Sequence, residues 1–399
     1  MNSRLDLLKP YPFSRLGTLL SESEANPELR LLSLAIGEPK HQAAQPAVDA
    51  IRNSLKELEH YPPTAGSVEL REIIANWANN RFELAGNSLS GIEHVLTVNG
   101  TREALFAIAQ VVTDPANKTG TVAMPNPFYQ IYEGAALLAG KQPLYLNCHA
   151  DNNMQPNWYE IDDAQWQSME LLYICSPGNP SGTYIPLEDM QYLIEKADKH
   201  DFVIVSDECY SELYLQDSNR APSILQACRN MGRNDFSRCL AFHSLSKRSN
   251  LPGLRSGFVA GDKNIIQKFL LYRTYHGSAM SGLAQQASAA AWSDENHAEA
   301  NRQAYREKYR EVSPLLDKHF DFVLPQAGFY LWLNTPIDDQ EFCKRLYEQH
   351  SLKVVPGSFL ARNTAQGNPG ENRIRVALVA PLDECIEGIE RLVDMATSL

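Results

Sequence analysis

The sequence predicts an α/β fold: a mostly parallel central sheet with helices on both faces, joined to a smaller α+β domain. Short apolar runs bounded by turn residues recur through the middle of the 399-residue chain, and they do not alternate polar with apolar side chains. Runs of this kind are typical of strands that are buried on both faces. Segments with helical periodicity separate these runs, and such alternation of strands and helices favours a parallel sheet.

The expected strands are rich in Val, Ile, Leu and Phe. In chain order they are 95–98, 121–124, 171–175, 202–206, 239–242 and 257–261. The clearest helix between them is 186–200, where acidic residues near the start and basic residues near the end complement the helix dipole. A second helix follows Gly100, because apolar residues recur at helical spacing from Ala104 to Val112 and form one face.

The two ends of the chain differ from this middle part. Residues 1 to about 45 are rich in turn residues. From about residue 283 the chain becomes helical, and it then gives two short strands, 329–333 and 373–378, and a final amphipathic helix. We therefore expect a large ligand-binding α/β domain over 46–282 and a small domain made of 1–45 and 283–399.

Composition limits the function classes. The net charge of −12 disfavours attraction to nucleic acid or to an anionic membrane surface. No apolar run approaches the ~20 residues that span a bilayer, and the N-terminus has prolines and charges where a signal peptide has an apolar stretch. The seven cysteines are scattered without metal-ligand spacing, so we expect free thiols, no metal site and a cytoplasmic protein.

The residues that follow the strands form the candidate site, because ligands of an open α/β sheet bind beyond the carboxyl ends of its strands. Four such segments carry chemistry: NGTRE after 95–98, SPGNPSGT after 171–175, DECY after 202–206 and HSLSK after 239–242. They contain a glycine turn at a helix start, an asparagine in a Pro/Gly loop, an aspartate followed by a tyrosine, and a lysine preceded by serines. Together they offer an anion site, a carboxylate and an amine.

The anion site is predicted around Gly100. The glycine turn opens a helix there, and the free N–H groups of a helix start bind anions. The segment around the lysine adds hydroxyl donors and a fixed positive charge that suits phosphate oxygens: Ser244, Ser246 and Arg255. We therefore expect a phosphate group to bind here.

The amine is Lys247 and the carboxylate is Asp207. A lysine that is partly desolvated beside another cation has a lowered pKa and attacks carbonyl groups. A carboxylate at a buried strand end needs a partner, and a protonated ring nitrogen would supply one. An amine for a Schiff base, a carboxylate for a pyridinium and a phosphate site together describe pyridoxal 5'-phosphate (PLP).

This set of segments resembles the fold-type I, class I/II aminotransferases, and the resemblance runs nearly end to end. It implies the PLP-dependent transferase fold. Lys247 is similar to the catalytic lysine that binds the cofactor covalently and shuttles protons, and Asp207 to the partner of its ring nitrogen. The other cofactor-binding positions that the resemblance implies are Tyr210 and Asn179 at the phenolic oxygen, Tyr129 stacked on the ring, and, at the phosphate, Ser244 and Arg255 with the backbone of Gly100, Thr101 and Arg102.

Substrate binding is also implied by the resemblance. Arg375 is similar to the arginine that clamps the substrate's α-carboxylate, and Gly37 and Asn179 fall where the family lines the same place. Arg373 is the alternative, but the residues that follow Arg375 fit the family's pattern better. Tyr61 matches a tyrosine that reaches the phosphate of the neighbouring subunit, which implies a homodimer with shared active sites.

The finer resemblance is to bacterial N-succinyldiaminopimelate aminotransferases of lysine and diaminopimelate biosynthesis, through HSLSKRSNLPGLRSGFVAGD, SPGNPSGT and QAGFYLWL. It implies N-succinyl-LL-2,6-diaminopimelate as amino donor and 2-oxoglutarate as acceptor, which yields glutamate. Cations that could meet the distal end of the substrate are Arg15, Lys40, Arg102 and Arg362.

Other activities remain open at this point, because a fold does not fix a reaction. They are an aspartate, aromatic or broad-specificity aminotransferase, a PLP-dependent β-lyase, decarboxylase or synthase, and a non-catalytic PLP-binding regulator. Nicotinamide, serine-hydrolase and zinc-protease motifs are missing, and GAALLAGK at 134–141 departs from a nucleotide phosphate loop in its spacing. Near the lysine, we expect His243 to be a satisfied structural histidine and Arg248 to be solvated or at an interface.

Overall fold

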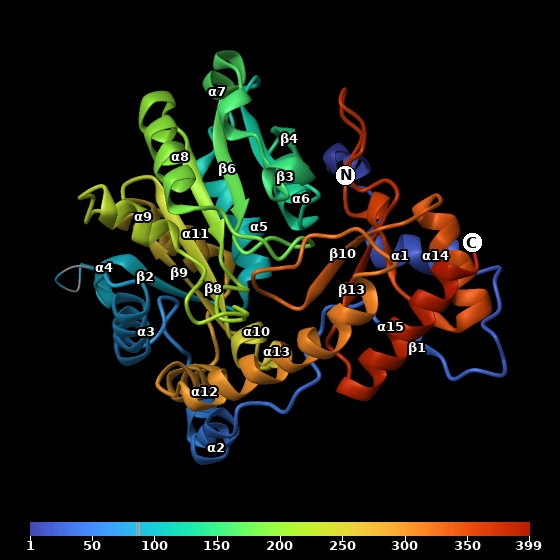
Figure 1. Cartoon of the computed structure of the whole chain (residues 1–399). Coiled ribbons are helices and arrows are strands. Elements are labelled where there is room, and N and C mark those ends of the chain that lie inside the picture. Colours follow the sequence, from blue (N-terminus) through green and yellow to red (C-terminus); the bar gives the residue numbers. More distant parts are fainter. Residues whose placement is uncertain (85, 87) are drawn as a thin grey trace.

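The structure, a computed structural model, describes residues 1–84, 86 and 88–399. Its centre is an eight-stranded sheet in the order β2-β9-β8-β7-β6-β3-β4-β5, with a smaller unit beside it (Figure 1). The strand bounds, in chain order, are β2 Val95–Val98, β3 Thr121–Asn126, β4 Gln142–His149, β5 Gln155–Pro156, β6 Met169–Cys175, β7 Val203–Asp207, β8 Cys239–Ser244 and β9 Gly257–Gly261.

The strands that matter for the site end along one edge of this sheet. Strands β8, β7, β6, β3 and β4 run parallel, whereas β9 is antiparallel to both of its neighbours, β8 and β2. Because of this, β2 runs in the same direction as β8, and its carboxyl end lies at the same edge. The prediction of a mostly parallel sheet is confirmed, and the segments that follow β2, β6, β7 and β8 converge at one place.

Both faces of the sheet are buried. In β6, Leu172 and Ile174 belong to one hydrophobic cluster, and Leu171 and Tyr173 to a second one. Successive side chains of a strand point to opposite faces, so a strand covered on both sides needs an unbroken apolar sequence. The first cluster draws on α3 (Val68–Arg81), α8 (Leu187–His200), α9 (Ile224–Asn230) and α12 (Gly282–Trp292), and the second on α5 (Thr101–Val112), α6 (Ile131–Leu138) and α11 (Lys263–His276).

The smaller unit is built on a three-stranded sheet in the order β10-β13-β12. These strands are β10 Tyr330–Asn334, β12 Val355–Pro356 and β13 Arg373–Ala377. The helices that share its apolar cluster are α13 (Asn296–Leu316), α14 (Asp339–His350) and α15 (Leu382–Thr397). The N-terminal part of the chain joins it, because β1 (Leu32–Ser33) pairs in parallel with β11 (Leu352–Lys353).

The remaining helices are short. They are α1 (Pro12–Leu19), α2 (Gln45–Asn53), α4 (Gly91–His94), α7 (Asp163–Ser168) and α10 (Leu245–Arg248). Helix α1 lies in the segment that its composition marked as turns, and Pro12 takes the first helical position, where a missing N–H costs nothing. Helix α10 carries the candidate lysine, as described below.

All six predicted strands of the large sheet occur, with small shifts of their ends, and so do the two helices expected between them. Strands β4 and β5 at the edge of the sheet were not expected. The division into 46–282 and the two flanking segments stays a prediction, and α12, beyond residue 282, adds side chains to the first cluster of the large sheet.

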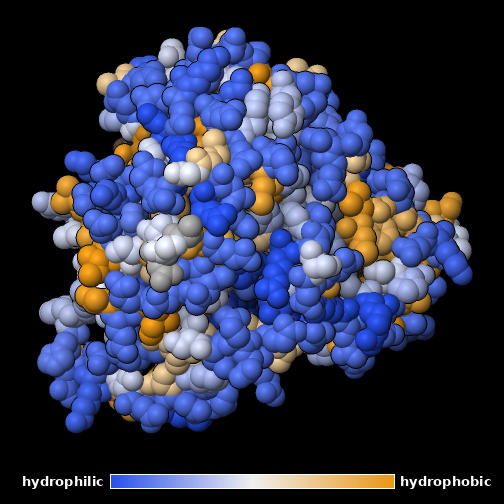
Figure 2. Space-filling model, turned by 60° about the vertical axis from the view of Figure 1, so that its left-hand side comes forward, coloured by the Kyte–Doolittle hydropathy of each residue, from blue (hydrophilic) through white to orange (hydrophobic). Residues whose placement is uncertain are grey.

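Hydrophilic residues cover most of the face in Figure 2, and hydrophobic residues form separate small patches on it. In the part of the chain that the structure describes, no helix combines the length and apolar character needed to cross a membrane.

Candidate active site

A pocket of about 520 Å³ opens where the strand ends converge. The predicted site residues that line it are Gly37, Thr101, Arg102, Tyr129, Asn179, Asp207, Tyr210, Ser244, Lys247, Arg255 and Arg375. They come from the ends of β6, β7 and β8, from the start of α5, and from the smaller unit through β13. The structure therefore brings together residues that lie far apart in the sequence.

Lys247 lies in α10, a four-residue helix that follows β8 directly. The helix begins there because the Ser244 hydroxyl caps it by accepting the Ser246 N–H at 3.1 Å. Lys247 Nζ donates to the carbonyl oxygen of Gly37 at 2.6 Å and lies 5.2 Å from the centre of the Phe329 ring. Burial lowers the pKa of this amine, which favours the neutral, nucleophilic form.

Asp207 ends β7 and is 5% exposed. Its Oδ2 accepts the Tyr132 hydroxyl at 2.7 Å, and its Oδ1 accepts the Cys209 N–H at the long distance of 3.3 Å. Burial raises the pKa of this carboxyl group, and the hydrogen bonds from Cys209 and Tyr132 act in the opposite direction. A buried carboxylate that faces a pocket in this way can be stabilised by a cation that enters the pocket.

The anion site forms between the start of α5 and the loop after α10. Gly100 precedes α5 with a φ of 79°, and a Cβ at this position would overlap the Arg255 guanidinium. Arg255 has a φ of 56° and is held by a 2.7 Å hydrogen bond from its Nη1 to the Pro252 carbonyl. The glycine thus allows a guanidinium to approach the free N–H groups of a helix start, an arrangement that suits a phosphate.

The opposite end of the pocket belongs to Arg375 on β13, which is 4% exposed. Its Nη1 donates to Asn179 Oδ1 and its Nη2 to the Ala35 carbonyl, both at 3.0 Å. Its Nε is buried and has no hydrogen-bond partner among the described residues. The guanidinium lies 4.4 Å from the Tyr330 ring. Between the two candidates for the carboxylate arginine, Arg375 is the one that lines the pocket.

Four further predicted residues have defined partners in the pocket. Tyr210 makes a 3.3 Å hydroxyl contact with Tyr330, and Arg102 Nε donates to the Tyr129 hydroxyl at 2.7 Å. Gly37 is packed so closely against Tyr330 that a Cβ would overlap the tyrosine hydroxyl. A side chain at position 37 would therefore displace the backbone from the site.

Two predicted residues are not among those that line the pocket. Gly100 lies next to the lining residue Thr101 and shapes the approach of Arg255, as described above. The side chain of Tyr61 is fully exposed in the single chain. Its role at the phosphate of a neighbouring chain stays a prediction.

Sequence reasoning missed two tyrosines beside the site. Tyr132 and Tyr330 have no motif of their own, and only the three-dimensional structure brings their hydroxyls to Asp207 and Tyr210. The signal that could have marked them is weak, because a tyrosine among apolar residues usually belongs to the core.

The two residues beside the lysine segment have different outcomes. The expectation that Arg248 is solvated or at an interface is wrong within this chain. It is 2% exposed and donates to Glu295 and to the carbonyl of Ala291. His243, expected to be a satisfied structural histidine, is buried, and its Nε2 lies 3.0 Å from Glu208 Oε2, but neither atom makes a hydrogen bond among the described residues.

The donors and acceptors of the pocket fit PLP. The buried Asp207 suits a protonated ring nitrogen, and the half-buried Lys247, whose pKa is lowered by burial, supplies an amine for an aldehyde. The space between the Gly100 turn and Arg255 offers the donors that a phosphate ester requires. Lys247 would hold the aldehyde of PLP, Asp207 its ring nitrogen, and the anion site its phosphate.

Comparison with known proteins agrees with this arrangement. The family model described as "Aminotransferase class I and II" matches residues 30–392. A curated LL-diaminopimelate aminotransferase from Aquifex aeolicus (strain VF5) is 28% identical over 400 residues, which cover 99% of this chain and 98% of the relative. A second protein of the same name, from Desulforudis audaxviator (strain MP104C), is also 28% identical, over 98% of this chain and 96% of its own.

Solved structures show the same likeness over the whole chain. An aminotransferase from Neisseria meningitidis Z2491 is 46% identical, with a TM-score of 0.94 and coverage of 99% of this chain and 100% of that one. The aminotransferase AspB from Helicobacter pylori 26695 is 34% identical, with a TM-score of 0.89 and coverage of 98% and 100%. A probable N-succinyldiaminopimelate aminotransferase from Thermus thermophilus, 22% identical with a TM-score of 0.83 over 96% and 99%, shares the fold. The chain therefore belongs to the aminotransferase class I and II family and is a PLP-dependent aminotransferase.

Proposed function

We propose that Lys247, Asp207 and Arg375 carry the transamination. PLP, when bound, supplies a ring that withdraws electrons from the substrate's α-carbon. Arg375 holds the α-carboxylate with its planar donors and so fixes the orientation of the α-carbon. Asp207 keeps a proton on the ring nitrogen, and Lys247 takes the proton from the α-carbon and returns it on the cofactor side.

The surroundings of Lys247 support the role of proton carrier. Because burial lowers the pKa of the amine, a larger share of it is neutral near pH 7 and can accept a proton. Its contact with the Gly37 carbonyl at 2.6 Å holds the amine in place, and the rings of Tyr210 and Phe329 lie beside it.

We further propose that the amino donor is an amino acid of the diaminopimelate type and that 2-oxoglutarate is the acceptor. The observation that carries this proposal is that Arg102 lines the same pocket as Arg375, in addition to Arg255 of the anion site. An arginine besides those proposed for the α-carboxylate and the phosphate suits a substrate with a carboxylate at each end. Of the other predicted distal cations, Arg362 is bonded to both carboxylate oxygens of Glu133, and Arg15 lies over an aromatic ring.

Two forms of this substrate differ at the distal nitrogen. The form expected from the sequence, N-succinyl-LL-2,6-diaminopimelate, has an uncharged amide there and an additional succinyl carboxylate. The curated relatives favour a second candidate, because their names state LL-diaminopimelate, which has a distal ammonium. Glu38 lines the pocket and would attract an ammonium but not an amide or a carboxylate.

The absorption spectrum of the PLP-loaded protein tests the reaction and the substrate together. Each of the two substrates is added without an oxo acid, followed by 2-oxoglutarate. We expect the band of the Lys247-bound cofactor to disappear and to return as glutamate forms. Pyruvate and ammonia released from an amino acid that carries a leaving group on its β-carbon would indicate a β-lyase. A band bleached only by aspartate or an aromatic amino acid would refute the diaminopimelate proposal. A band that no amino acid changes would indicate a regulator.

Two variants sharpen this experiment. Lys247→Ala should lose both the band and the turnover, and retained activity would refute the assignment of the lysine. Glu38→Gln should raise KM for LL-diaminopimelate and leave KM for the succinylated form unchanged or lower. If Glu38→Gln affected both substrates alike, Glu38 would not distinguish them.

We also propose a cytoplasmic homodimer in which Tyr61 of one chain reaches the phosphate site of the other. The full exposure of the Tyr61 side chain in the single chain supports this, because it leaves the hydroxyl free for a partner. We propose further that each chain divides into a large PLP-binding domain over 46–282 and a small domain made of 1–45 and 283–399. Sedimentation of the unmodified protein tests the dimer. In Tyr61→Phe the hydroxyl is lost but the ring is kept, so a weaker affinity for PLP in a dimer that persists would indicate the phosphate contact.

A further inference from the structure

The segment between β1 and α2 touches the candidate lysine. Gly37, in this segment, accepts a hydrogen bond from Lys247 Nζ at 2.6 Å. Four residues later, His41 is half-buried against α13, the long helix that runs from the large sheet to the smaller unit (Figure 1). The stretch 37–41 is thus held at both of its ends, by the bond from Lys247 and by the packing of His41 on α13. The contact at His41 has no part in the proposed chemistry.

His41 packs on one face of α13. Its ring contacts Asn301, Tyr305 and Lys308, which are spaced by four and three residues and therefore share a helix face. The Nδ1 atom lies 2.8 Å from Asn301 Oδ1, and the Nε2 atom lies 2.7 Å from Lys308 Nζ. An ammonium group can only donate, so Nε2 accepts and Nδ1–H donates to Asn301. His41 is therefore neutral in this arrangement.

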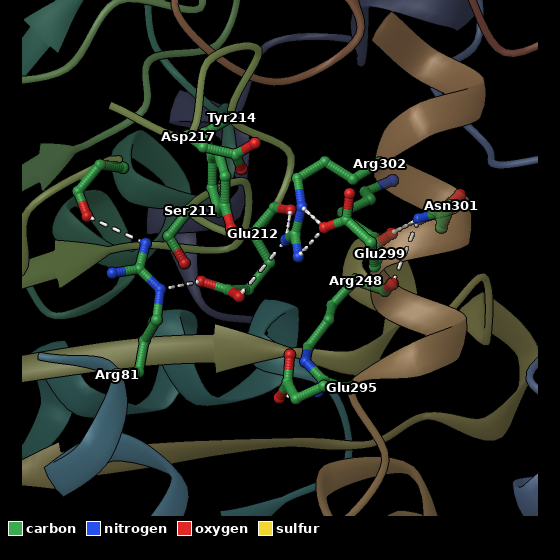
Figure 3. A network of polar contacts seen from close by, with 12 residues as sticks. Arg81, Ser211, Glu212, Tyr214, Asp217, Arg248, Glu295, Glu299, Asn301 and Arg302 are labelled. Atoms are coloured by element: carbon green, nitrogen blue, oxygen red, sulfur yellow. Dashed lines mark hydrogen bonds and ion pairs between the residues drawn. The ribbon is translucent and has the colours of Figure 1, made fainter. Parts of the chain in front are cut away.

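Asn301 connects His41 to the backbone of the lysine loop. Its side chain, 5% exposed, donates from Nδ2 to the carbonyl of Lys247 at 3.0 Å. The same Nδ2 donates to the carbonyl of Arg248 at 3.2 Å (Figure 3). Its Oδ1 accepts Asn250 Nδ2 at 2.8 Å as well as the bond from His41. Because Nδ2 faces two carbonyls, the amide cannot turn around without losing these bonds, so its oxygen faces His41.

We propose that His41 is a positioning residue that holds the segment 37–41 over the site and couples it, through Asn301, to the backbone of Lys247. The segment is attached to the lysine in two ways. The Gly37 carbonyl accepts a hydrogen bond from the Lys247 amine, and His41 donates to Asn301, whose side chain donates to the backbone carbonyl of Lys247. Through these two attachments, His41 maintains the desolvation of Lys247. The positioning role of His41 is independent of the proposed role of Lys247. Only its expected effect on the reactivity of the lysine rests on that proposed role.

The charges around His41 set the pH range in which this attachment holds. The positive charge against His41 comes from Lys308 on α13, and the Asn301 amide and the Tyr305 ring are its other contacts among the described residues. The charge of Lys308 is in turn influenced by Lys40, from the segment itself, and by the thiol of Cys385. Burial lowers the pKa of His41, and burial lowers the pKa of Lys308 to about 8. A protonated His41 would turn an N–H toward an ammonium, so the attachment should weaken as the pH falls through the pKa of His41.

Hydrogen–deuterium exchange tests the positioning role directly. His41→Leu keeps the bulk and removes both hydrogen bonds, whereas His41→Gln keeps a donor and an acceptor. We expect amides in 36–44 and 245–250 to exchange about fivefold to tenfold faster in His41→Leu, in the cofactor-free and in the PLP-loaded protein, and near the normal rate in His41→Gln. His319→Gln, at an exposed histidine beyond the end of α13, is the matched control.

A second readout follows the reactivity of the lysine. The rate at which the cofactor-free protein captures PLP depends on pH through the neutral fraction of the Lys247 amine. Since burial is the main cause of its lowered pKa, the midpoint in His41→Leu should move up by ~0.5 pH unit or more. Lys308→Met, which leaves Asn301 in place, should give a smaller change in the same direction.

The results separate this role from general stability and from the proposed function. Faster exchange spread over the whole chain, with no change in the midpoint, would show that His41 only stabilises the fold. Exchange and midpoint equal to those of His319→Gln would refute the proposal. Because exchange is also measured in the cofactor-free protein without substrate, the positioning role of His41 can be supported even if the proposed role of Lys247 fails.

Discussion

Replacing Tyr132 by phenylalanine should shift the pH dependence of the enzyme through Asp207. Tyr132 is fully buried, and its hydroxyl donates to Asp207 Oδ2 at 2.7 Å. A hydrogen bond to a charged group contributes ~1.5–3 kcal/mol. One pH unit corresponds to 1.36 kcal/mol, so the loss of this bond should raise the pKa of Asp207 by ~1–2 pH units. Burial already raises the pKa of Asp207, and the Tyr132 bond opposes that effect, so its removal adds to the effect of burial.

The assay is the rate of amino-group transfer to PLP as a function of pH. In Tyr132→Phe, we expect the acid limb of the profile to move up by ~1–2 pH units, because Asp207 must be ionised to hold a protonated ring nitrogen. Tyr173→Phe is the matched control, since Tyr173 stacks on Tyr132 at 4.6 Å but donates to the Leu105 carbonyl. If both variants shifted the acid limb equally, or neither did, Tyr132 would not act through Asp207.

Three further predictions follow from other parts of the structure. Arg375→Lys removes the planar pair of donors, and we expect kcat/KM for the amino donor to fall ~10–100-fold in steady-state kinetics, with PLP still bound. Gly100→Ala adds a Cβ against the Arg255 guanidinium at a φ of 79°, so PLP affinity, measured by fluorescence titration, should fall ~10-fold or more while the midpoint of thermal unfolding changes little. The pKa of Lys308 is lowered to about 8, so the unfolded chain binds the additional proton between pH 8 and about 10, and stability from this group rises with pH in that window. Urea unfolding of Lys308→Met should therefore show a flatter dependence on pH there; an unchanged slope would contradict the lowered pKa.

Several of the site residues that could be predicted from the sequence share one property: they end or follow a strand, or start a helix at a turn. Arg375, within β13, was identified only through the family resemblance. Asp207 and Lys247 could be placed because a parallel sheet brings the ends of its strands to one edge, whatever the details of packing. The large sheet itself could be predicted from its unbroken apolar runs. Strand β4 could not, because Pro143 and several polar residues interrupt its pattern and it lies near the edge of the sheet.

The residues that support the site from behind could not be predicted. Tyr132 lies within an apolar helix and looks like any core aromatic until α6 and β7 are placed together. His41 and Asn301 are 260 residues apart, and no local pattern links them. Arg248 follows the lysine in a Ser-rich loop, where an arginine is usually solvated, but α12 and α13 cover it in the folded chain. Contacts of this kind depend on tertiary packing, which sequence periodicity does not encode.

The antiparallel β9 has a consequence for how the enzyme can move. Because β9 returns beside β8, the single connection between these two strands carries both Lys247 and Arg255. The amine of Lys247 and the guanidinium of Arg255, with their proposed roles, therefore belong to one short chain segment whose two ends continue into neighbouring strands of the sheet. Gly37 and Arg375 lie on other segments, associated with the smaller unit. With the roles proposed above, a shift of that unit would change the contacts to the substrate and leave the cofactor contacts of Lys247 and Arg255 in place, so that the product leaves in each cycle while the cofactor stays bound.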